Sequence, residues 1–270
     1  GFRAVVQSCR GTFGSGGEFS PFRHEQEDGL ATIAWLKQQP WFNGQFATIG
    51  PSYLGLTQWA VARDAGPELK AMSTWISSAE FRSITFPGEA FWLESGLTWT
   101  VLVHTQEKRS FSGFMDMFSR RDKNMPGYRT LPLIDAPKTM LGHPVKFWQE
   151  WVTHEEPGDD WWAATDFTQD VSQVTAPNHM IGGWYDIFLP QTLRDYQVLR
   201  QAGQQPYLTI GPWAHTDSPL IPHALKETLI WLRAHLLGDR TGLREAPVRL
   251  FVMGANEWRD YPDWPVTGTR

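Results

Sequence analysis

The sequence has a single cysteine, Cys9, among 270 residues, and it contains no Cys-x-x-Cys pair. One thiol cannot form an intrachain disulfide, and a structural zinc site is excluded because no paired Cys or His residues stand at ligand spacing. This cysteine usage permits a reducing compartment and slightly favours the cytoplasm, without identifying the compartment.

Positive charge, long apolar runs and cofactor motifs are also lacking. The 24 Lys and Arg are outnumbered by 29 Asp and Glu, giving a formal charge of −5, which excludes a basic nucleic-acid binder. No apolar stretch approaches the roughly 20 residues of a membrane span. The glycine-rich loop at 11–17 lacks a Gly-Lys-Ser/Thr ending, and no metal, flavin or nicotinamide motif is present. We therefore expect no nucleic-acid partner, no membrane and no cofactor, and the sequence leaves a homo-oligomer open.

Aromatic residues, in contrast, are abundant, with 15 Trp and 16 Phe. Hydrophobic residues make up 41% of the chain, which is ordinary for a globular protein. So many large rings indicate an extensive core, an aromatic-lined cavity, or both.

The first part of the chain alternates strands and helices at short intervals. Apolar runs predict strands at 4–9, 46–50 and 70–76, and the segments 27–39 and 53–61 between them have helical character. Such alternation is typical of βαβ units, in which a mostly parallel sheet carries helices on both faces.

Residues 77–170 differ, because aromatic residues crowd there without strand alternation, and we interpret this stretch as an inserted helical cap. The pattern then resumes with strands at 179–183, 207–211 and 248–253 and helices at about 190–202 and 222–237. In the last helix Leu225, Leu229, Leu232 and Leu236 predict one apolar stripe. The polar tail to Arg270 has no evident place in the sheet.

The sharpest local motif is Gly50-Pro51-Ser52-Tyr53-Leu54-Gly55, which joins a predicted strand to a predicted helix. It resembles a nucleophile elbow, a tight turn that exposes a serine hydroxyl at the carboxyl end of a sheet. The second glycine, Gly55, lies at +3 from the serine rather than at +2. On pattern alone, Ser52 is more often an ordinary turn residue than a nucleophile.

A serine nucleophile needs a base and an orienting acid, and later strand ends offer both in the order Ser, Asp, His. Asp186 follows the strand at 179–183, and His215 follows the strand at 207–211. Asp195 and Asp217 compete for the role of the acid, and His223 competes for that of the base. Asp195 falls inside a helix, Asp217 lies two residues beyond His215, and His223 stands at a helix start, so all three are less apt.

The motifs together resemble the CocE/NonD hydrolase family, the group of the cocaine esterases and X-Pro dipeptidyl-peptidases. The matching segments, which span nearly the whole chain, are Arg10-Gly11, Pro40-Trp41 with Asn43-Gly44, the elbow with its +3 glycine, Gly183-Trp184-Tyr185-Asp186, Gly211-Pro212-Trp213-Ala214-His215, and 248–254 with Trp258-Arg259. The resemblance implies an α/β-hydrolase fold and favours the branch that hydrolyses acyl esters.

Residue by residue, the resemblance makes Ser52 the nucleophile, His215 the general base, Asp186 its orienting acid and the backbone N–H of Tyr53 an oxyanion donor. It places a second donor, a tyrosine hydroxyl, upstream of residue 1. Ser8 stands where the family usually has Asp. We therefore expect a fragment of a longer protein, lacking the first strands of the hydrolase sheet and most of a C-terminal jelly-roll domain.

The expected organisation is a hydrolase core at 1–76, a helical cap at 77–170, the rest of the core at 171–246 and the start of a jelly-roll domain at 247–270. Aromatic residues of the cap and of the acid loop are the candidates for the substrate pocket: Phe86, Trp92, Trp99 and Phe188. The alternative is that these rings only seal the cap against the sheet.

Three functions follow from these observations. The first is a serine esterase or amidase acting on a small ester or amide through an acyl-enzyme. The second is an X-Pro dipeptidyl-peptidase or α-amino-acid ester hydrolase, for which Glu80, Asp159 and Asp160 are the acids that could bind a free amine. The third is a binding module on a hydrolase fold that has lost activity.

Overall fold

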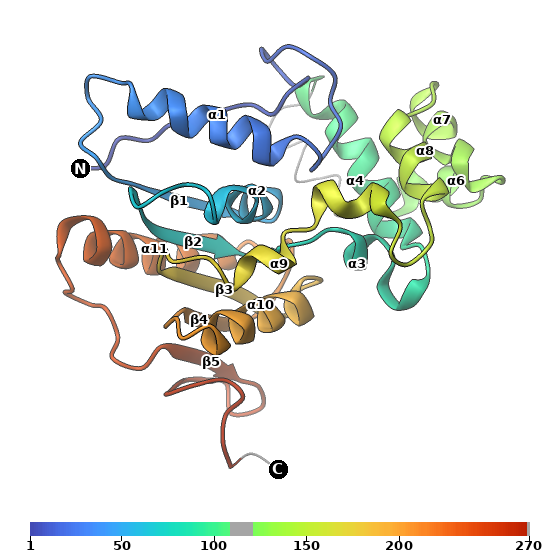
Figure 1. The fold of residues 1–270 in the computed structure, drawn as a ribbon. Helices are drawn as coiled ribbons and strands as arrows, with labels where there is room; N and C mark the ends of the chain where they lie inside the picture. Colours follow the sequence, from blue (N-terminus) through green and yellow to red (C-terminus); the bar gives the residue numbers. More distant parts are fainter. Residues whose placement is uncertain (109–120, 269–270) are drawn as a thin grey trace. The chain divides into compact units, whose positions relative to one another are not determined.

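The computed structural model describes residues 1–108 and 121–268 (Figure 1). One six-stranded sheet runs in the order β1-β2-β3-β4-β5-β6. Its strands are β1 Phe46–Pro51, β2 Leu69–Trp75, β3 Asn178–Tyr185, β4 Tyr207–Ala214, β5 Val248–Val252 and β6 Glu257–Tyr261. Neighbours from β1 to β5 pair in parallel, and only β6 is antiparallel. The predicted α/β class with a mostly parallel sheet is confirmed.

Four helices of ten residues or more belong to the same compact unit as the sheet: α1 Glu25–Lys37, α2 Tyr53–Ala62, α10 Leu189–Gln201 and α11 Leu220–Leu237. The other unit contains one helix of similar length, α4 Leu93–Thr105. The shorter helices are α3 Arg82–Thr85, α6 Met125–Tyr128, α7 Ala136–Leu141, α8 Lys146–Thr153 and α9 Thr168–Val171. The 3₁₀ turns are η1 Pro87–Glu89, η2 Gln106–Lys108, η3 Arg121–Asn124, η4 Leu133–Asp135 and η5 Asp160–Thr165.

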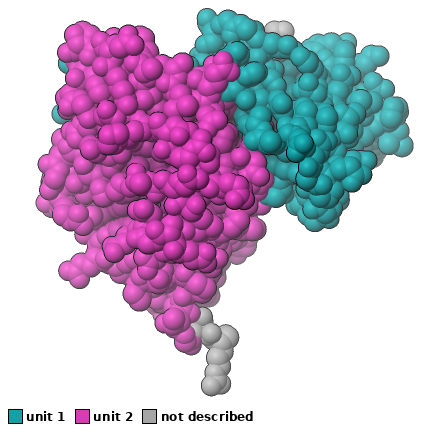
Figure 2. Space-filling view, in the orientation of Figure 1, with its two compact units in different colours: residues 1–24, 81–164 teal, residues 25–80, 165–270 magenta. Residues whose placement is uncertain are grey.

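The chain divides into two compact units, which Figure 2 colours separately. Unit 1 contains residues 1–24 and 81–164, and unit 2 contains residues 25–80 and 165–270. The whole sheet belongs to unit 2, and β5 and β6 extend it beyond residue 246. The segment boundaries that we expected from the sequence, including a separate β domain from 247, stay predictions.

Unit 2 buries the middle of its sheet between helices. Ser73 and Trp75, two residues apart on β2, both direct polar atoms to the Thr228 hydroxyl of α11, at 2.7 and 3.0 Å. Side chains two apart on a strand share a face, so α11 covers that face of the sheet. In Figure 1, α11 passes behind the strands and α10 lies in front of them. Six of the seven residues of β2 are buried, as expected for a central parallel strand.

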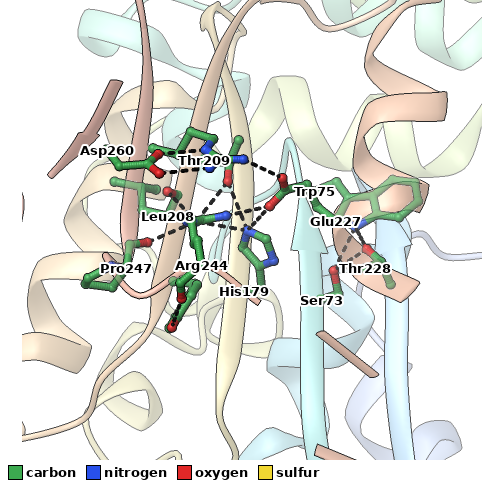
Figure 3. Close-up of polar contacts among 12 residues, drawn as sticks. Ser73, Trp75, His179, Leu208, Thr209, Glu227, Thr228, Arg244, Pro247 and Asp260 are labelled. Atoms are coloured by element: carbon green, nitrogen blue, oxygen red, sulfur yellow. Dashed lines mark hydrogen bonds and ion pairs between the residues drawn. The ribbon is translucent and has the colours of Figure 1, made fainter. Parts of the chain in front are cut away.

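The polar residues between α11 and the sheet form a buried network (Figure 3). Arg244 donates to Glu227 at 2.5 Å, to the carbonyl oxygens of Leu208 and Pro247 at 3.0 Å each, and to the Thr209 hydroxyl at 3.1 Å. The Thr209 hydroxyl also lies 3.0 Å from Nε2 of His179. Burial and the nearby guanidinium of Arg244 lower the pKa of His179, so its ring is neutral. Arg244 therefore ties α11 to the start of β4 and to the residue before β5.

Unit 1 has a core of aromatic side chains. Trp99 of α4 lies with its ring centroid 5.6 Å from both Phe22 and Trp151 and 5.9 Å from Phe147. Trp148 and Trp151 of α8 are fully buried. The helical character and the aromatic crowding that the sequence predicts for this region are therefore both present in 81–108 and 121–164.

Three local expectations are wrong. Residues 4–9 form no strand, since no strand of the described residues pairs with them, and Val5 and Val6 are 49% and 94% exposed. The tail supplies β6, which pairs with β5. The apolar stripe of α11 does not define its buried face, because Leu225 and Leu229 are 42% and 51% exposed. Within residues 1–108 and 121–268, no helix is long and apolar enough to cross a membrane.

Candidate active site

Ser52 occupies a strained turn between β1 and α2. Its φ of 53° and ψ of −119° place it in a region that residues with a Cβ rarely adopt. Its amide donates to the carbonyl oxygen of Trp75 at 2.9 Å, and its own carbonyl oxygen accepts from the amides of Gly55 and Leu56 at 2.8 and 3.1 Å. These bonds start the helix immediately after the serine and hold the strained backbone in place.

The two glycines of the elbow are required by close neighbours. A Cβ on Gly50 would lie 2.4 Å from Cβ of Leu54. A Cβ on Gly55 would lie 2.3 Å from Cβ and 2.4 Å from Oγ of Ser77. Ser77 thus explains why the residue at +3 from Ser52 is glycine. The Ser77 side chain occupies the space that a side chain at position 55 would need.

Asp186 and His215 follow β3 and β4, so both lie at the carboxyl edge of the parallel sheet together with Ser52. Nδ1 of His215 is 2.7 Å from Oδ2 of Asp186, and Nε2 is 3.0 Å from Oγ of Ser52. The side chain of Asp186 is 1% exposed, and that of His215 is 22% exposed. The other oxygen of Asp186 accepts from the amide of Phe188 at 2.8 Å, which fixes the carboxylate.

This arrangement can move a proton from a serine hydroxyl to an imidazole. With Nδ1 protonated and facing the carboxylate, Nε2 of His215 presents a lone pair to the hydroxyl of Ser52. The rival residues make other contacts. Asp195 is buried against Arg194, Asp217 accepts from the amide of Ala214, and the ring of His223 stacks on Trp258.

The acid loop depends on Gly183, which leads to a prediction. A Cβ there would lie 2.0 Å from the carbonyl oxygen of Trp213, whereas a Cβ on Gly182 would meet side-chain ends alone, Cδ1 of Ile210 at 3.0 Å and Cγ2 of Thr192 at 3.7 Å. We expect Gly183→Ala to lower the free energy of unfolding by about 2–3 kcal/mol, since backbone must shift. Gly182→Ala is the matched control and should cost under about 1 kcal/mol. Urea unfolding measures both, and equal losses would contradict this reading.

Two of the predicted oxyanion and pocket residues, Tyr53 and Phe188, belong to the same unit as these three side chains. Tyr53 begins α2, so its backbone N–H lies in the first turn of that helix, and its hydroxyl donates to Glu25. The ring of Phe188 is buried, with its centroid 5.3 Å from that of His215. Phe86, Trp92 and Trp99 belong to unit 1, and their pocket role stays a prediction.

The acids considered for binding an amine belong to different compact units and make local contacts within them. Glu80, in unit 2, is buried with an oxygen 3.3 Å from Nη1 of Arg194. Asp159, in unit 1, accepts from the amide of Trp161 and contacts His154, each at 2.8 Å, and Asp160 begins η5. In the part of the chain that the structure describes, no group of three or more His, Cys, Asp or Glu side chains could hold a metal ion.

Asp195 supplies a pH-dependent prediction. Burial raises the pKa of Asp195 to about 6 from its usual 3.8, although Arg194 and the amide of Ala79 oppose the rise. The folded protein then holds this proton more tightly than the unfolded chain. The contribution to stability is therefore fully present below about pH 4 and is lost as the pH rises through 6.

Asp195→Asn removes this titration. We expect the free energy of unfolding of the wild type, relative to that of the variant, to fall by on the order of 2 kcal/mol between about pH 4 and pH 7. Urea unfolding of both proteins across this range measures the difference. A difference that is constant with pH, or that rises, would contradict the assignment.

Sequence reasoning missed Ser77 and Thr192, which hydrogen-bond in the immediate surroundings of the elbow. The Ser77 hydroxyl donates to the carbonyl oxygen of Ser52, and the Thr192 hydroxyl donates to the carbonyl oxygen of Ser77. Neither residue stands in a recognisable motif. The only sequence signal is the small, polar pair Ser77-Ser78 directly after a central strand.

Comparisons with known proteins agree with this architecture. The model of the X-Pro dipeptidyl-peptidase (S15) family matches residues 1–217. Cocaine esterase of Rhodococcus sp. (strain MB1 Bresler) is 29% identical over the whole chain, which spans 51% of that protein, so the chain covers about half the length of this curated relative.

Two solved structures share the fold. An aminopeptidase of a marine sediment archaeon, Thaumarchaeota archaeon, has a TM-score of 0.72 at 22% identity, with 95% of this chain and 47% of that one covered. A CocE/NonD family hydrolase of Staphylococcus aureus has a TM-score of 0.69 at 22% identity, with 97% and 42% covered. The α/β-hydrolase fold and the resemblance predicted from the motifs are confirmed. The chain belongs to the X-Pro dipeptidyl-peptidase (S15) family of hydrolases.

Proposed function

We propose that this chain carries the active site of a serine hydrolase that cleaves acyl esters through Ser52, His215 and Asp186. The observation that carries the proposal is the unbroken chain of contacts from the Ser52 hydroxyl through the His215 ring to the buried Asp186 carboxylate, 3.0 and 2.7 Å long. The elbow that exposes the serine and the placement of all three residues at strand ends support the same role.

The reaction follows from the geometry. Ser52 Oγ attacks the acyl carbon while its proton passes to Nε2 of His215, and the charge that develops on the carbonyl oxygen faces the N–H of Tyr53. The imidazolium, stabilised by Asp186, then gives its proton to the departing alcohol oxygen, which leaves an acyl-serine. Water attacks this ester with His215 again as the base, and the acid and free serine are released.

The substrate class is proposed from two observations. The buried ring of Phe188 beside His215 provides an apolar surface next to the reacting groups, which favours an uncharged ester or amide. The relative that matches the whole chain is named as an esterase. We therefore place small esters with an apolar acyl or alcohol group first.

A second candidate is hydrolysis of a peptide bond next to a free amino terminus. The observation that favours it is the family model, which is that of X-Pro dipeptidyl-peptidases. A free ammonium group needs a carboxylate to pair with, and the local partners of two candidate acids weigh against this function, because Glu80 already pairs with Arg194 and Asp159 with His154. A non-catalytic module, the third candidate, is disfavoured by the assembled contacts of Ser52 and His215.

The test compares three probes on the purified chain: p-nitrophenyl butyrate, glycyl-prolyl-p-nitroanilide and the same anilide with its amine acetylated. The ester proposal expects Ser52-dependent turnover of the butyrate that exceeds turnover of either anilide. Preferential cleavage of the free-amine anilide would support the peptidase instead. Absence of turnover of all three by a folded chain would contradict both.

A further inference from the structure

The segment that follows β2, residues 76–80, is buried and strained. Ile76 has φ of +40°, a conformation that a β-branched residue adopts only when its surroundings enforce it. Its amide donates to the carbonyl oxygen of Ile181 on β3 at 2.6 Å. Ser77, Ser78 and Ala79 are all buried. The chain is therefore held tightly just where it passes the nucleophile elbow.

Ser77 makes two hydrogen bonds that join opposite sides of the candidate site. Its hydroxyl donates to the carbonyl oxygen of Ser52 at 2.8 Å. Its own carbonyl oxygen accepts from the hydroxyl of Thr192 at 2.9 Å. Thr192 lies in the first turns of α10, and its amide donates to the carbonyl oxygen of Phe188, which follows Asp186 by two residues.

A second bond anchors the same segment to α10. The amide of Ala79 donates to Oδ2 of Asp195 at 2.9 Å, one turn after Thr192. The same segment also packs closely against α2. Cβ of Ser77 occupies the space where a side chain on residue 55 would stand, so only glycine fits there. The segment thus has fixed contacts to the elbow on one side and to the helix that follows the acid loop on the other.

We propose that Ser77 is a positioning residue for the triad, and that with Thr192 it sets the separation between the loop of Ser52 and the loop of Asp186. The proposal rests on the proposed function. His215 bridges these two loops, so its contacts to Ser52 and Asp186 require the loops to keep their spacing. Small displacements of reacting groups cost large factors in rate, on the order of 10²-fold for about 1 Å.

The loss of the Ser77 hydroxyl should affect rate more than folding. In Ser77→Ala the carbonyl oxygen of Ser52 still accepts from the amides of Gly55 and Leu56, so no buried polar group is left unpaired. The variant loses the hydrogen bond from residue 77 to the elbow but keeps the Cβ that packs beside Gly55. A positioning role predicts that the rate of reaction at Ser52 falls while the thermal unfolding temperature changes little.

The experiment measures the second-order rate constant for labelling of Ser52 by a fluorophosphonate, together with thermal unfolding, in the full chain. We expect Ser77→Ala and Thr192→Val to label about tenfold more slowly than the wild type, and Thr192→Ser, which keeps the hydroxyl, to label within about twofold of it. Ser78→Ala is the matched control, because that hydroxyl is equally buried but accepts only from the amide of Glu80. It should label at the wild-type rate.

A kinetic split provides the second readout. With p-nitrophenyl butyrate, Ser77→Ala should lower kcat about tenfold with KM within about twofold of the wild type, since the pocket itself is unchanged. Wild-type labelling and kcat in Ser77→Ala would overturn the positioning role and leave the proposed function intact. An equal fall in Ser78→Ala would overturn it too, because general loosening would then explain the effect. A folded wild type that does not label would overturn both proposals.

Discussion

Ser52→Ala is expected to lower turnover of p-nitrophenyl butyrate by at least about 10⁴-fold, to the level that binding and the oxyanion donor alone support. The reason is that the hydroxyl of Ser52 is the nucleophile and lies 3.0 Å from its base. The free energy of unfolding should change little, because the backbone bonds of the elbow do not involve the side chain.

His215→Ala supplies the companion measurement. When residues act as one catalytic unit, their effects on turnover do not add. The double variant Ser52→Ala/His215→Ala should therefore retain the same turnover as either single variant. His223→Ala is the control, since its ring packs on Trp258 and Trp213 rather than on Ser52. Additive losses in the double variant, or undiminished turnover in His215→Ala, would contradict a shared mechanism.

Arg244→Met is expected to cause the largest loss of stability, about 3–5 kcal/mol. The side chains of Arg244 and Glu227 are only 7% and 10% exposed. Removing the guanidinium deprives the Glu227 carboxylate of one partner and leaves the carbonyl oxygens of Leu208 and Pro247 without this donor (Figure 3). Lysine should not restore stability, because one ammonium group cannot reproduce the planar fork that reaches all these acceptors.

Arg233→Met is the matched control for this loss, because Arg233 also forms an ion pair but is 54% exposed. Exposed pairs contribute little, so a cost under about 1 kcal/mol is expected. Urea unfolding at neutral pH measures both variants. Equal losses of unfolding free energy in Arg233→Met and Arg244→Met would contradict the claim that the buried network makes Arg244 more important for stability.

The sequence predicts most of what positions the candidate site. The elbow is recognisable because a small-residue turn must join strand to helix around Ser52. The strand ends are recognisable because central parallel strands are mostly apolar, so the ionisable residues Asp186 and His215 stand out just after them. The meeting of all three side chains then follows from the parallel sheet.

Other features depend on long-range contacts that carry no local signal. The face of α11 that packs on the sheet includes Glu227 and Thr228, whose polar groups are satisfied by Arg244 and Ser73. The leucine pattern therefore identifies that face only in part, since Leu232 and Leu236 pack in the core whereas Leu225 and Leu229 are exposed. The apolar run at 4–9 indicates a strand, yet a strand exists only where another pairs with it. Ser77 acts through Ser52 and Thr192, residues 25 and 115 positions away in the chain.

The most direct test of the central claim is labelling of the full chain with a fluorophosphonate, followed by intact-mass measurement and peptide mapping. The account predicts one added group per chain, located on Ser52, and no labelling of Ser52→Ala or His215→Ala. Such reagents report an activated serine without a known substrate. Labelling at another residue, or no labelling of a chain shown to be folded, would contradict the assignment of Ser52 as the nucleophile.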